Sequence, residues 1–192
     1  MTIEDQCFAA RSALSPEVCE QLLAGIAQGQ SDAFEAFYRQ TARSIYAYAL
    51  SLTRNAQNAQ DAMMETYLAI RTHADRYAPC GKPLAWVFTI ARNAVRMQQR
   101  AQVRELPLEE LAEDAICVPD DRDAAIALRE AMRILSEQER EIVTLHAVSG
   151  LRHREIAQAL SLPLSTVLSK YTRALKKLRK RLSECDGEEG AR

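Results

Sequence analysis

The segment from Leu135 to Leu182 constrains the fold more than any other part of the chain, because its apolar residues recur with helical spacing and its breaks are sharply placed. Ser136 and Glu139 stand three residues apart, which is the spacing of a capping box at a helix start. Gly150 is a natural stop for that first helix. Its core-facing positions repeat at three-residue intervals, namely Ile142, Leu145 and Val148.

Two further helices follow within the same segment. Ile156 and Leu160 give the second helix a single apolar face. The turn Ser161-Leu162-Pro163 cannot extend it, because proline disfavours helical geometry in the residue before it. Ser165 is the expected N-cap of a long third helix, whose predicted inner face consists of Val167, Tyr171, Leu175, Leu178 and Leu182. This pattern predicts a helix-turn-helix, a geometry that fits the major groove of DNA.

The third helix is strongly basic. Between positions 170 and 181 there are seven basic residues and no acidic one: Lys170, Arg173, Lys176, Lys177, Arg179, Lys180 and Arg181. A phosphate backbone is the natural partner of such a stretch. A solvated basic helix end, stabilised by the helix dipole, is the alternative interpretation. Together with the helix-turn-helix pattern, the charge favours DNA.

Charge is unevenly distributed along the chain, although the net charge is only −1. A second basic stretch without acidic residues contains Lys82, Arg92, Arg96, Arg100 and Arg104. By contrast, residues 105–123 hold eight acidic residues against one arginine. The average therefore conceals two positive surfaces and a negative connector.

The whole chain is predicted to be all-α, because its 192 residues contain six glycines and six prolines and no alternating strand pattern. We expect helices from Pro16 to about Gly29, over 31–53, over 56–77 and from Pro83 onward. Their predicted inner faces are Phe34, Phe37, Tyr38, Ile45, Tyr46 and Ala49, then Val87, Ile90, Ala91, Ala94 and Val95. We predict two small helical domains, 15–104 and 122–183, joined by an acidic linker over 105–121.

Several classes of protein are disfavoured by the sequence. The first residues include Glu4 and Asp5 and lack an apolar core segment, so no secretory signal is expected. The sequence has no run of 18 apolar residues, so no membrane span is expected. The five cysteines and three histidines show no metal-ligand spacing, and Cys80 lies in a predicted loop. We find no phosphate loop or nucleophile motif, and expect neither an enzyme nor a cofactor.

Two blocks of the chain resemble the extracytoplasmic-function (ECF) sigma factors. The first contains DAMMETYLAIRTHADRY from Asp61 and LAWVFTIARNAVR from Leu84, and the second contains GLRHREIAQALSLPLSTV from Gly150. Both blocks in this order, joined by a short linker, cover about residues 22–182. The resemblance implies a cytoplasmic promoter-specificity subunit that binds core RNA polymerase and promoter DNA and is held by an anti-sigma factor.

The resemblance also assigns roles to individual residues of the first block. Asp61, Glu65 and Tyr67 would dock on the β′ clamp helices of the polymerase, although the two acids also suit a solvated helix face. The loop from Tyr77 to Lys82 would take up a flipped base of the −10 element, which offsets part of the unstacking cost. The other residues expected near this element are Trp86, Arg92, Asn93, Arg96 and Arg100. There is an alternative for each group. Trp86 could be an ordinary core residue, and the arginines could be surface residues without a partner.

In the second block, Thr166, Ser169, Lys170 and Arg173 fall where the family reads the −35 element. Lys176 and Lys177 would contact phosphate, which positions without specifying sequence. The chain departs from the family pattern at Met64, Arg71, Met97 and Leu168. These departures keep two other functions open: a sigma-like decoy that titrates an anti-sigma factor, and a stand-alone helix-turn-helix regulator.

Overall fold

All regular elements in the described part of the protein are helices, as the sequence predicts. The structure is a computed structural model that describes residues 14–102, 128 and 130–189. The α-helices are α2 (Pro16–Ala27), α3 (Ser31–Thr53), α4 (Ala56–His73), α5 (Pro83–Gln102), α7 (Glu137–Ala147), α8 (His153–Leu160) and α9 (Leu164–Glu189), with a short 3₁₀ helix η1 at Ala74–Arg76.

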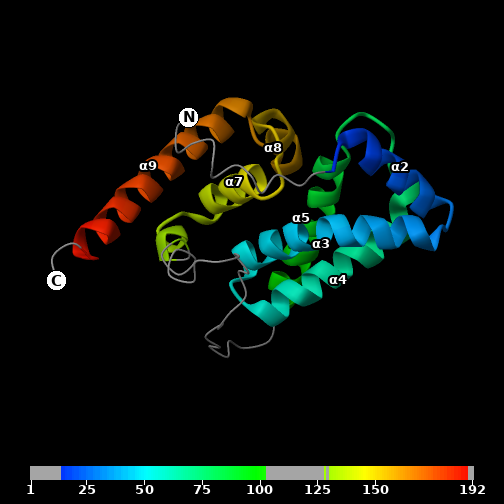
Figure 1. Ribbon diagram of the computed structural model, residues 1–192, viewed down its shortest axis with the longest axis horizontal. Helices are drawn as coiled ribbons and strands as arrows, with labels where there is room; N and C mark the ends of the chain where they lie inside the picture. Colours follow the sequence, from blue (N-terminus) through cyan, green and yellow to red (C-terminus); the bar gives the residue numbers. More distant parts are fainter. Residues whose placement is uncertain (1–13, 103–127, 129, 190–192) are drawn as a thin grey trace.

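Helices α2, α3, α4 and α5 form an N-terminal bundle (Figure 1). Local signals fix its helix starts: the Ser15 hydroxyl accepts from Val18 N, and the Asn55 side chain accepts from Asn58 N. Arg54, in the left-handed region at φ 55°, allows the chain to reverse between α3 and α4. The largest fully buried side chains include Phe37, Ile45, Tyr48, Ile70, Val87 and Val95.

The predicted core of this bundle needs two corrections on α3. Tyr38 is 38% exposed, so its assignment to the inner face is wrong. Thr41 and Tyr48 are buried instead, and both satisfy their hydroxyl groups by hydrogen bonds within the protein. A polar side chain in the core is tolerated when it finds a partner, and sequence periodicity does not reveal that partner.

Helices α7, α8 and α9 form the C-terminal module. Its first helix begins with the predicted capping box, in which Ser136 and Glu139 exchange backbone and side-chain hydrogen bonds. A small core under α9 contains Ala131, Leu135, Val143, Ala174 and Leu178. The predicted cap Ser165 is wrong, because α9 already begins at Leu164 and Pro163 O accepts the first hydrogen bonds.

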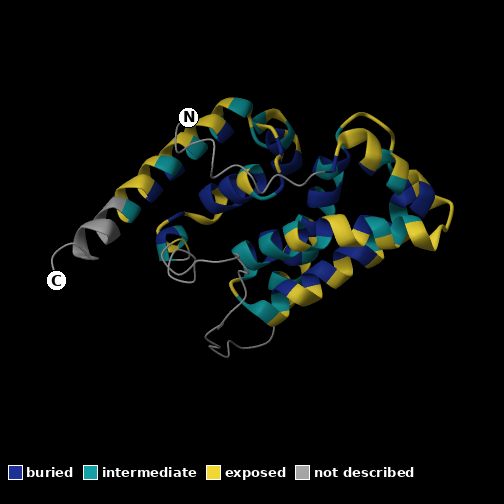
Figure 2. Cartoon of the chain, in the orientation of Figure 1, coloured by how far each residue is buried: buried dark blue, intermediate teal, exposed yellow. Residues whose placement is uncertain are grey.

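The two modules pack on each other through one continuous core. Apolar residues of the C-terminal module, including Ile142, Leu145, Ile156 and Leu160, belong to the same cluster as the N-terminal core. Helix α7 contacts α3, and α8 contacts α5. Figure 2 shows the buried residues of both modules where they meet, and exposed residues along the outer side of α9. The C-terminal part of α9 extends away from the N-terminal bundle (Figure 1).

Some sequence predictions fall outside the described residues. These are the acidic linker over 105–121, the start of the C-terminal domain at 122, and Arg104. Of the cysteines in the described part, Cys19 is buried and Cys80 is exposed, and both are free thiols. Burial and the neighbouring Glu20 carboxylate raise the pKa of Cys19 to about 12, so this thiol stays protonated.

Candidate nucleic-acid interface

The turn between α8 and α9 orients the candidate recognition helix. Ser161 adopts the left-handed conformation at φ 55°, and its amide donates to Ala157 O and Gln158 O. Leu162 N also donates to Ala157 O at 2.9 Å, which closes the end of α8. Val167, one turn into α9, is fully buried against the main core. The start of α9 is therefore fixed by both backbone hydrogen bonds and packing.

A cluster of three rings holds α9 against α7 and α8. The rings of His146 and His153 stack with centroids 4.6 Å apart, and Tyr171 of α9 meets both edge-on at 4.9 and 4.6 Å. Burial, and then the neighbouring His146, lower the pKa of His153, so this imidazole is neutral at neutral pH. Aromatic packing of this kind fixes the rotation of α9 about its own axis.

The fixed rotation of α9 decides which of the predicted −35 residues face solvent. Ser169, Arg173 and Lys176 are exposed, whereas Thr166 and Lys170 are half-buried. Leu168 lies among them with 44% of its surface exposed. Arg173 Nε donates to Ser169 O at 3.2 Å, which leaves the other guanidinium nitrogens toward the solvent side. The structure thus brings the predicted residues together on the outer side of α9.

Lys177 differs from the other predicted DNA-binding residues. Its ammonium group donates to both carboxylate oxygens of Glu139, at 2.7 and 3.0 Å. Glu139 is buried beneath it and is also part of the capping box of α7. In this arrangement Lys177 ties α9 to α7, and its charge is neutralised by the carboxylate. The expected phosphate contact of Lys177 would compete with this ion pair, and the Lys177 side chain is 45% exposed.

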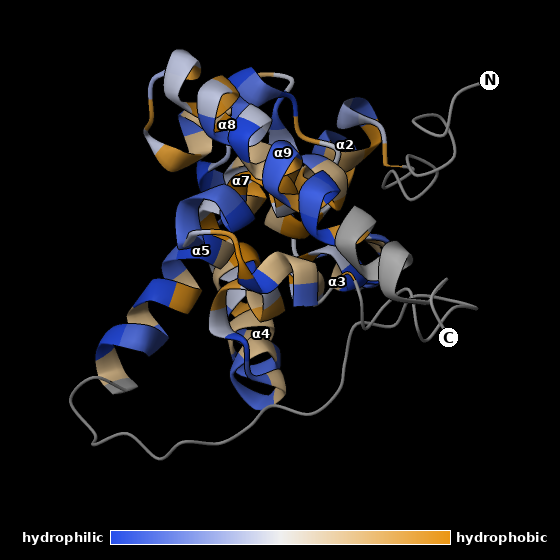
Figure 3. Ribbon diagram, turned by 90° about the vertical axis from the view of Figure 1, so that its left-hand side faces the viewer, coloured by the Kyte–Doolittle hydropathy of each residue, from blue (hydrophilic) through white to orange (hydrophobic). Residues whose placement is uncertain are grey.

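On α5, the predicted −10 residues fall into two groups along the helix. Asn93, Arg96 and Arg100 are exposed, and Met97 beside them is 70% exposed. The C-terminal half of α5 carries Arg96, Met97 and Arg100. It projects from the bundle and is largely hydrophilic (Figure 3). A projecting helix with arginines one turn apart presents a cationic edge that suits a phosphate backbone.

Arg92, one turn earlier on the same helix, is engaged within the protein. Its Nε donates to Glu141 Oε1 at 2.9 Å, and only 11% of its side chain is exposed. Tyr48 of α3 donates to the same oxygen at 2.8 Å. Burial, and then the charge of Glu141, hold the pKa of Tyr48 well above its usual range, so it remains a donor. Glu141 of α7 therefore joins both modules. Arg92 was predicted to lie on the DNA-binding surface, but its side chain is largely buried.

The loop from Tyr77 to Lys82 lies between η1 and α5. The ring centroids of Tyr77 and Trp86 lie 5.4 Å apart, with an angle of 55° between the ring planes. Trp86 is half-buried, so it combines core packing with a surface open to solvent. Lys82 Nζ donates to Gln158 Oε1 of α8 at 3.0 Å, which makes a further polar contact between the modules.

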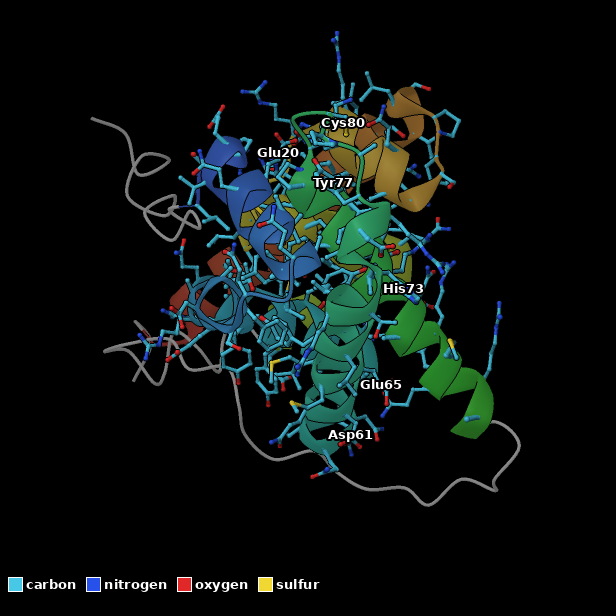
Figure 4. All side chains as sticks on the ribbon, turned by 90° about the vertical axis from the view of Figure 1, so that its right-hand side faces the viewer. Glu20, Asp61, Glu65, His73, Tyr77 and Cys80 are labelled. Atoms are coloured by element: carbon cyan, nitrogen blue, oxygen red, sulfur yellow. The ribbon has the colours of Figure 1, made fainter. Side chains whose placement is uncertain are left out.

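The predicted polymerase-binding residues separate into surface and core. Asp61 and Glu65 are exposed one turn apart on α4 (Figure 4), with Met64 at 50% and Leu68 at 56% exposure on the same helix. Tyr67 is only 3% exposed, and its hydroxyl lies 2.8 Å from the hydroxyl of Thr41. The expectation for Tyr67 is therefore corrected: it supports α4 from inside and offers no surface to a partner.

Two carboxylates with structural roles were missed from the sequence. Glu141 lies between Arg140 and Ile142 on α7, so the sequence around it reads as an ordinary charged helix segment and does not reveal that it is buried. Glu20 lies on α2, before the first of the two family-like blocks, and nothing in its surroundings marks it. Both carboxylates bind partners that are distant in the sequence. Glu141 binds Arg92, 49 residues away, and Glu20 binds Tyr77, 57 residues away.

Neither a metal centre nor a membrane span is present in the described residues. Within this part of the chain, no three His, Cys, Asp or Glu side chains gather as metal ligands would. Among the helices described, none combines the length and apolar character that a membrane crossing requires.

Comparison with known proteins identifies the class of the two modules. The model of the family Sigma-70 region 2 matches residues 37–105, and that of Sigma-70, region 4 matches residues 125–178. The chain therefore contains the two helical regions of a sigma factor of RNA polymerase.

Individual relatives narrow this class. The chain is 34% identical over 173 residues to the ECF RNA polymerase sigma factor SigK of Mycobacterium ulcerans, which covers 82% of this chain and 90% of the relative. It is 30% identical over 165 residues to the RNA polymerase sigma factor CarQ of Myxococcus xanthus, a match that covers 83% of this chain and 95% of that relative. The chain belongs to the ECF family of RNA polymerase sigma factors.

A solved structure shares the fold. It is the sigma factor RpoE in complex with the anti-sigma factor NepR from Bartonella quintana, with a TM-score of 0.67 and 25% identity. The match covers 78% of this chain and 96% of that one. The similarity extends over both modules, which fits the predicted order of two helical units.

Proposed function

We propose that this ECF sigma factor directs core polymerase to promoters by binding the two promoter elements with separate helical faces. The observation that supports this most is the outer side of α9, where Ser169, Lys170 and Arg173 are presented by a helix whose rotation is fixed. These residues read the −35 element together with Thr166. Lys176, one turn further along, contacts phosphate and positions the helix.

The −10 element is bound at the other module. The loop 77–82 and Trp86 take up the unpaired base, and Asn93, Arg96 and Arg100 follow the strand along the projecting half of α5. Arg92 joins this surface only when it leaves Glu141, because its guanidinium is enclosed between the modules. Promoter binding through Arg92 therefore requires the two modules to separate.

Core polymerase is bound through α4. Asp61 and Glu65 supply acidic groups, and the exposed Met64 and Leu68 supply apolar contact beside them. Protein interfaces commonly combine such an apolar centre with a charged rim. An anti-sigma factor is the further partner, since the matched sigma factor RpoE was solved with one. The protein acts in the cytoplasm, as a binding subunit and without catalytic residues of its own.

Reconstituted transcription tests the proposal. Purified chain is added to bacterial core polymerase, and run-off products are mapped on genomic DNA fragments. We expect promoter-specific products, together with a stable complex between the chain and the polymerase. A complex without products would contradict promoter direction by this chain. Absence of both complex and products would indicate the sigma-like decoy, which the leucine at position 168 and the enclosed Arg92 favour. Absence of a complex with well-folded protein would contradict polymerase binding altogether.

A double variant, Lys170→Ala with Arg173→Ala, assigns the −35 surface within the same assay. A bidentate hydrogen bond to a base edge is worth roughly 1–3 kcal/mol, so transcription from a mapped promoter should fall at least about tenfold. The control carries Arg39→Ala and Arg133→Ala, which removes two charges from exposed ion pairs elsewhere. Equal products from both double variants would remove these two residues from the −35 interface.

A further inference from the structure

One carboxylate oxygen collects three hydrogen bonds from the loop that precedes α5. Glu20 Oε1 accepts from the Tyr77 hydroxyl at 2.7 Å, from Cys80 N at 3.1 Å and from Gly81 N at 2.8 Å. Glu20 lies on α2, about 60 residues earlier in the chain, at separations of 57, 60 and 61. Figure 4 shows Glu20, Tyr77 and Cys80 together at the end of the bundle opposite Asp61.

The three donors span the loop from its first residue almost to its last. Ala78, Pro79, Cys80 and Gly81 are exposed and lie outside regular secondary structure, so no helix satisfies the backbone N–H groups of the three that have one. Gly81 has φ +71°, a conformation that favours glycine, so the chain turns back at this point. Glu20 therefore holds both sides of a turn that has little packing of its own.

Glu20 is charged at neutral pH, which strengthens these contacts. The hydrogen bond from Tyr77, and then that from the Gly81 amide, lower the pKa of Glu20 below its usual range. Hydrogen bonds to a charged acceptor are stronger than neutral ones. Tyr77 also packs against Trp86 of α5, so a continuous series of contacts runs from α2 through the loop to α5.

We propose that Glu20 is a positioning residue that holds the loop 77–82 in the shape that takes up an unpaired base of the −10 element. This inference rests on the proposed function of the loop. A loop ordered before binding does not lose that conformational freedom during binding, so the affinity for the captured base is higher. Glu20 lies outside the matched region 2, which begins at residue 37, so the loop is supported by a helix that precedes the matched region.

The first test measures the loop in the full-length protein without DNA or polymerase. Amide hydrogen exchange is compared among wild type, Glu20→Ala and Glu20→Gln, with Glu17→Ala as the control on the same helix. Glu17 is suited to this because it is an exposed carboxylate on the same helix. We expect the Cys80 and Gly81 amides to exchange about tenfold faster in Glu20→Ala, since local opening sets exchange in such loops.

The second test measures base selection. Core polymerase with each variant transcribes a DNA library randomised over the −10 element, and product sequences are counted. Glu20→Ala should reduce the preference at one −10 position about fivefold and leave the −35 preference unchanged, because only the loop loses its order. Glu20→Gln should retain most of the preference, since its amide oxygen still accepts. Thermal unfolding of each variant establishes that the fold is intact.

The outcomes separate this inference from the function on which it rests. Unchanged exchange at Cys80 and Gly81 in Glu20→Ala would overturn the positioning role whatever the protein does. Faster exchange with an unchanged −10 preference would also overturn it, leaving Glu20 a purely structural residue. If the wild-type chain selects no promoter, the proposed function fails first, and the exchange result still reports whether Glu20 orders the loop.

Discussion

The two cationic helices differ in how much of their charge reaches solvent. On α9 the candidate base-reading residues lie on the outer side of the module, whereas Lys177 is paired with a buried carboxylate. On α5 the stripe of arginines is divided, because Arg92 lies under the C-terminal module whereas Arg96 and Arg100 lie on the projecting half. A basic stretch in a sequence therefore indicates a surface only where no other element covers it.

The difference has a physical consequence for the order of binding. The proposed −35 surface on α9 is available in the closed arrangement of the two modules. The proposed −10 surface on α5 would be complete only after Glu141 releases Arg92, and that step would expose part of the shared core. Separation thus costs free energy that polymerase and promoter contacts must offset, and variants of the two helices should respond differently.

Removing Arg92 should have the largest effect on the isolated protein. Arg92→Ala leaves the carboxylate of Glu141 buried, with Tyr48 as its remaining donor. Breaking one side of a buried ion pair commonly costs about 3 kcal/mol or more, so we expect a loss of that size in the free energy of unfolding. Urea unfolding followed by circular dichroism measures it.

The control for this variant is an exposed ion pair on α3. Glu35 and Arg39 are 60% and 75% exposed, and pairs of this kind contribute about 0.5 kcal/mol or less. Arg39→Ala should therefore be nearly neutral. If the two variants had equal stability, the pair between Arg92 and Glu141 would not hold the modules together, and the contrast between the two helices would disappear.

A second prediction concerns the projecting half of α5 and has an intermediate effect. Arg96→Ala with Arg100→Ala should reduce the salt dependence of promoter binding by the polymerase complex, by a log–log slope of about 1 for each phosphate that the variant no longer neutralises. Binding is measured over a series of salt concentrations. An unchanged slope would remove both arginines from the DNA interface.

Arg92→Ala in the same titration sharpens the comparison. If the modules separate on the promoter, Arg92 reaches a phosphate, and its removal should reduce the slope by about 1 as well. If they stay closed, the slope should equal that of wild type, since Glu141 already neutralises the guanidinium. The two results distinguish an opened from a closed sigma factor on DNA.

Local features of the fold were predictable from the sequence. Helix α3 runs from Ser31 to Thr53 as predicted, because polar breakers mark both of its ends. The capping box of α7 was also predicted, since its two residues interact within one turn. Ser165 failed as a cap because α9 begins one residue before it, at Leu164, where the carbonyl of Pro163 accepts the first hydrogen bonds.

The site was predictable only where chemistry and exposure coincide. The family resemblance pointed to Ser169, Lys170 and Arg173, and the structure places these three residues on one side of α9. The same reasoning failed to anticipate that Arg92 is enclosed and that Tyr67 is core, because burial of a residue depends on elements far away in the chain. Contacts such as that of Glu141 with Tyr48, 93 residues apart, leave no periodic signal.

The pairing of Lys177 with Glu139 is the counterpart on α9 of the enclosed pair on α5, and it is the weaker of the two. The Lys177 side chain is 45% exposed, whereas Glu139 is only 6% exposed. Burial alone would raise the pKa of Glu139, but the hydrogen bonds from Lys177 and Ser136 lower it to about 2, from 4.5 for an unpaired group. Acid should therefore loosen α9 from α7.

Glutamine at position 139 tests this contribution with little change in shape. A carboxyl whose pKa is lowered by folding stabilises the protein above its unfolded pKa, and that stability disappears as the pH falls through the folded value. At pH 6 the free energy of unfolding of wild type should exceed that of Glu139→Gln by about 1 kcal/mol. The difference is small because the ion pair is partly exposed. The gap should then close between pH 4.5 and about 2. Urea unfolding at stepwise lower pH measures both proteins, and parallel curves over that interval would show that Glu139 does not hold α9 through its charge.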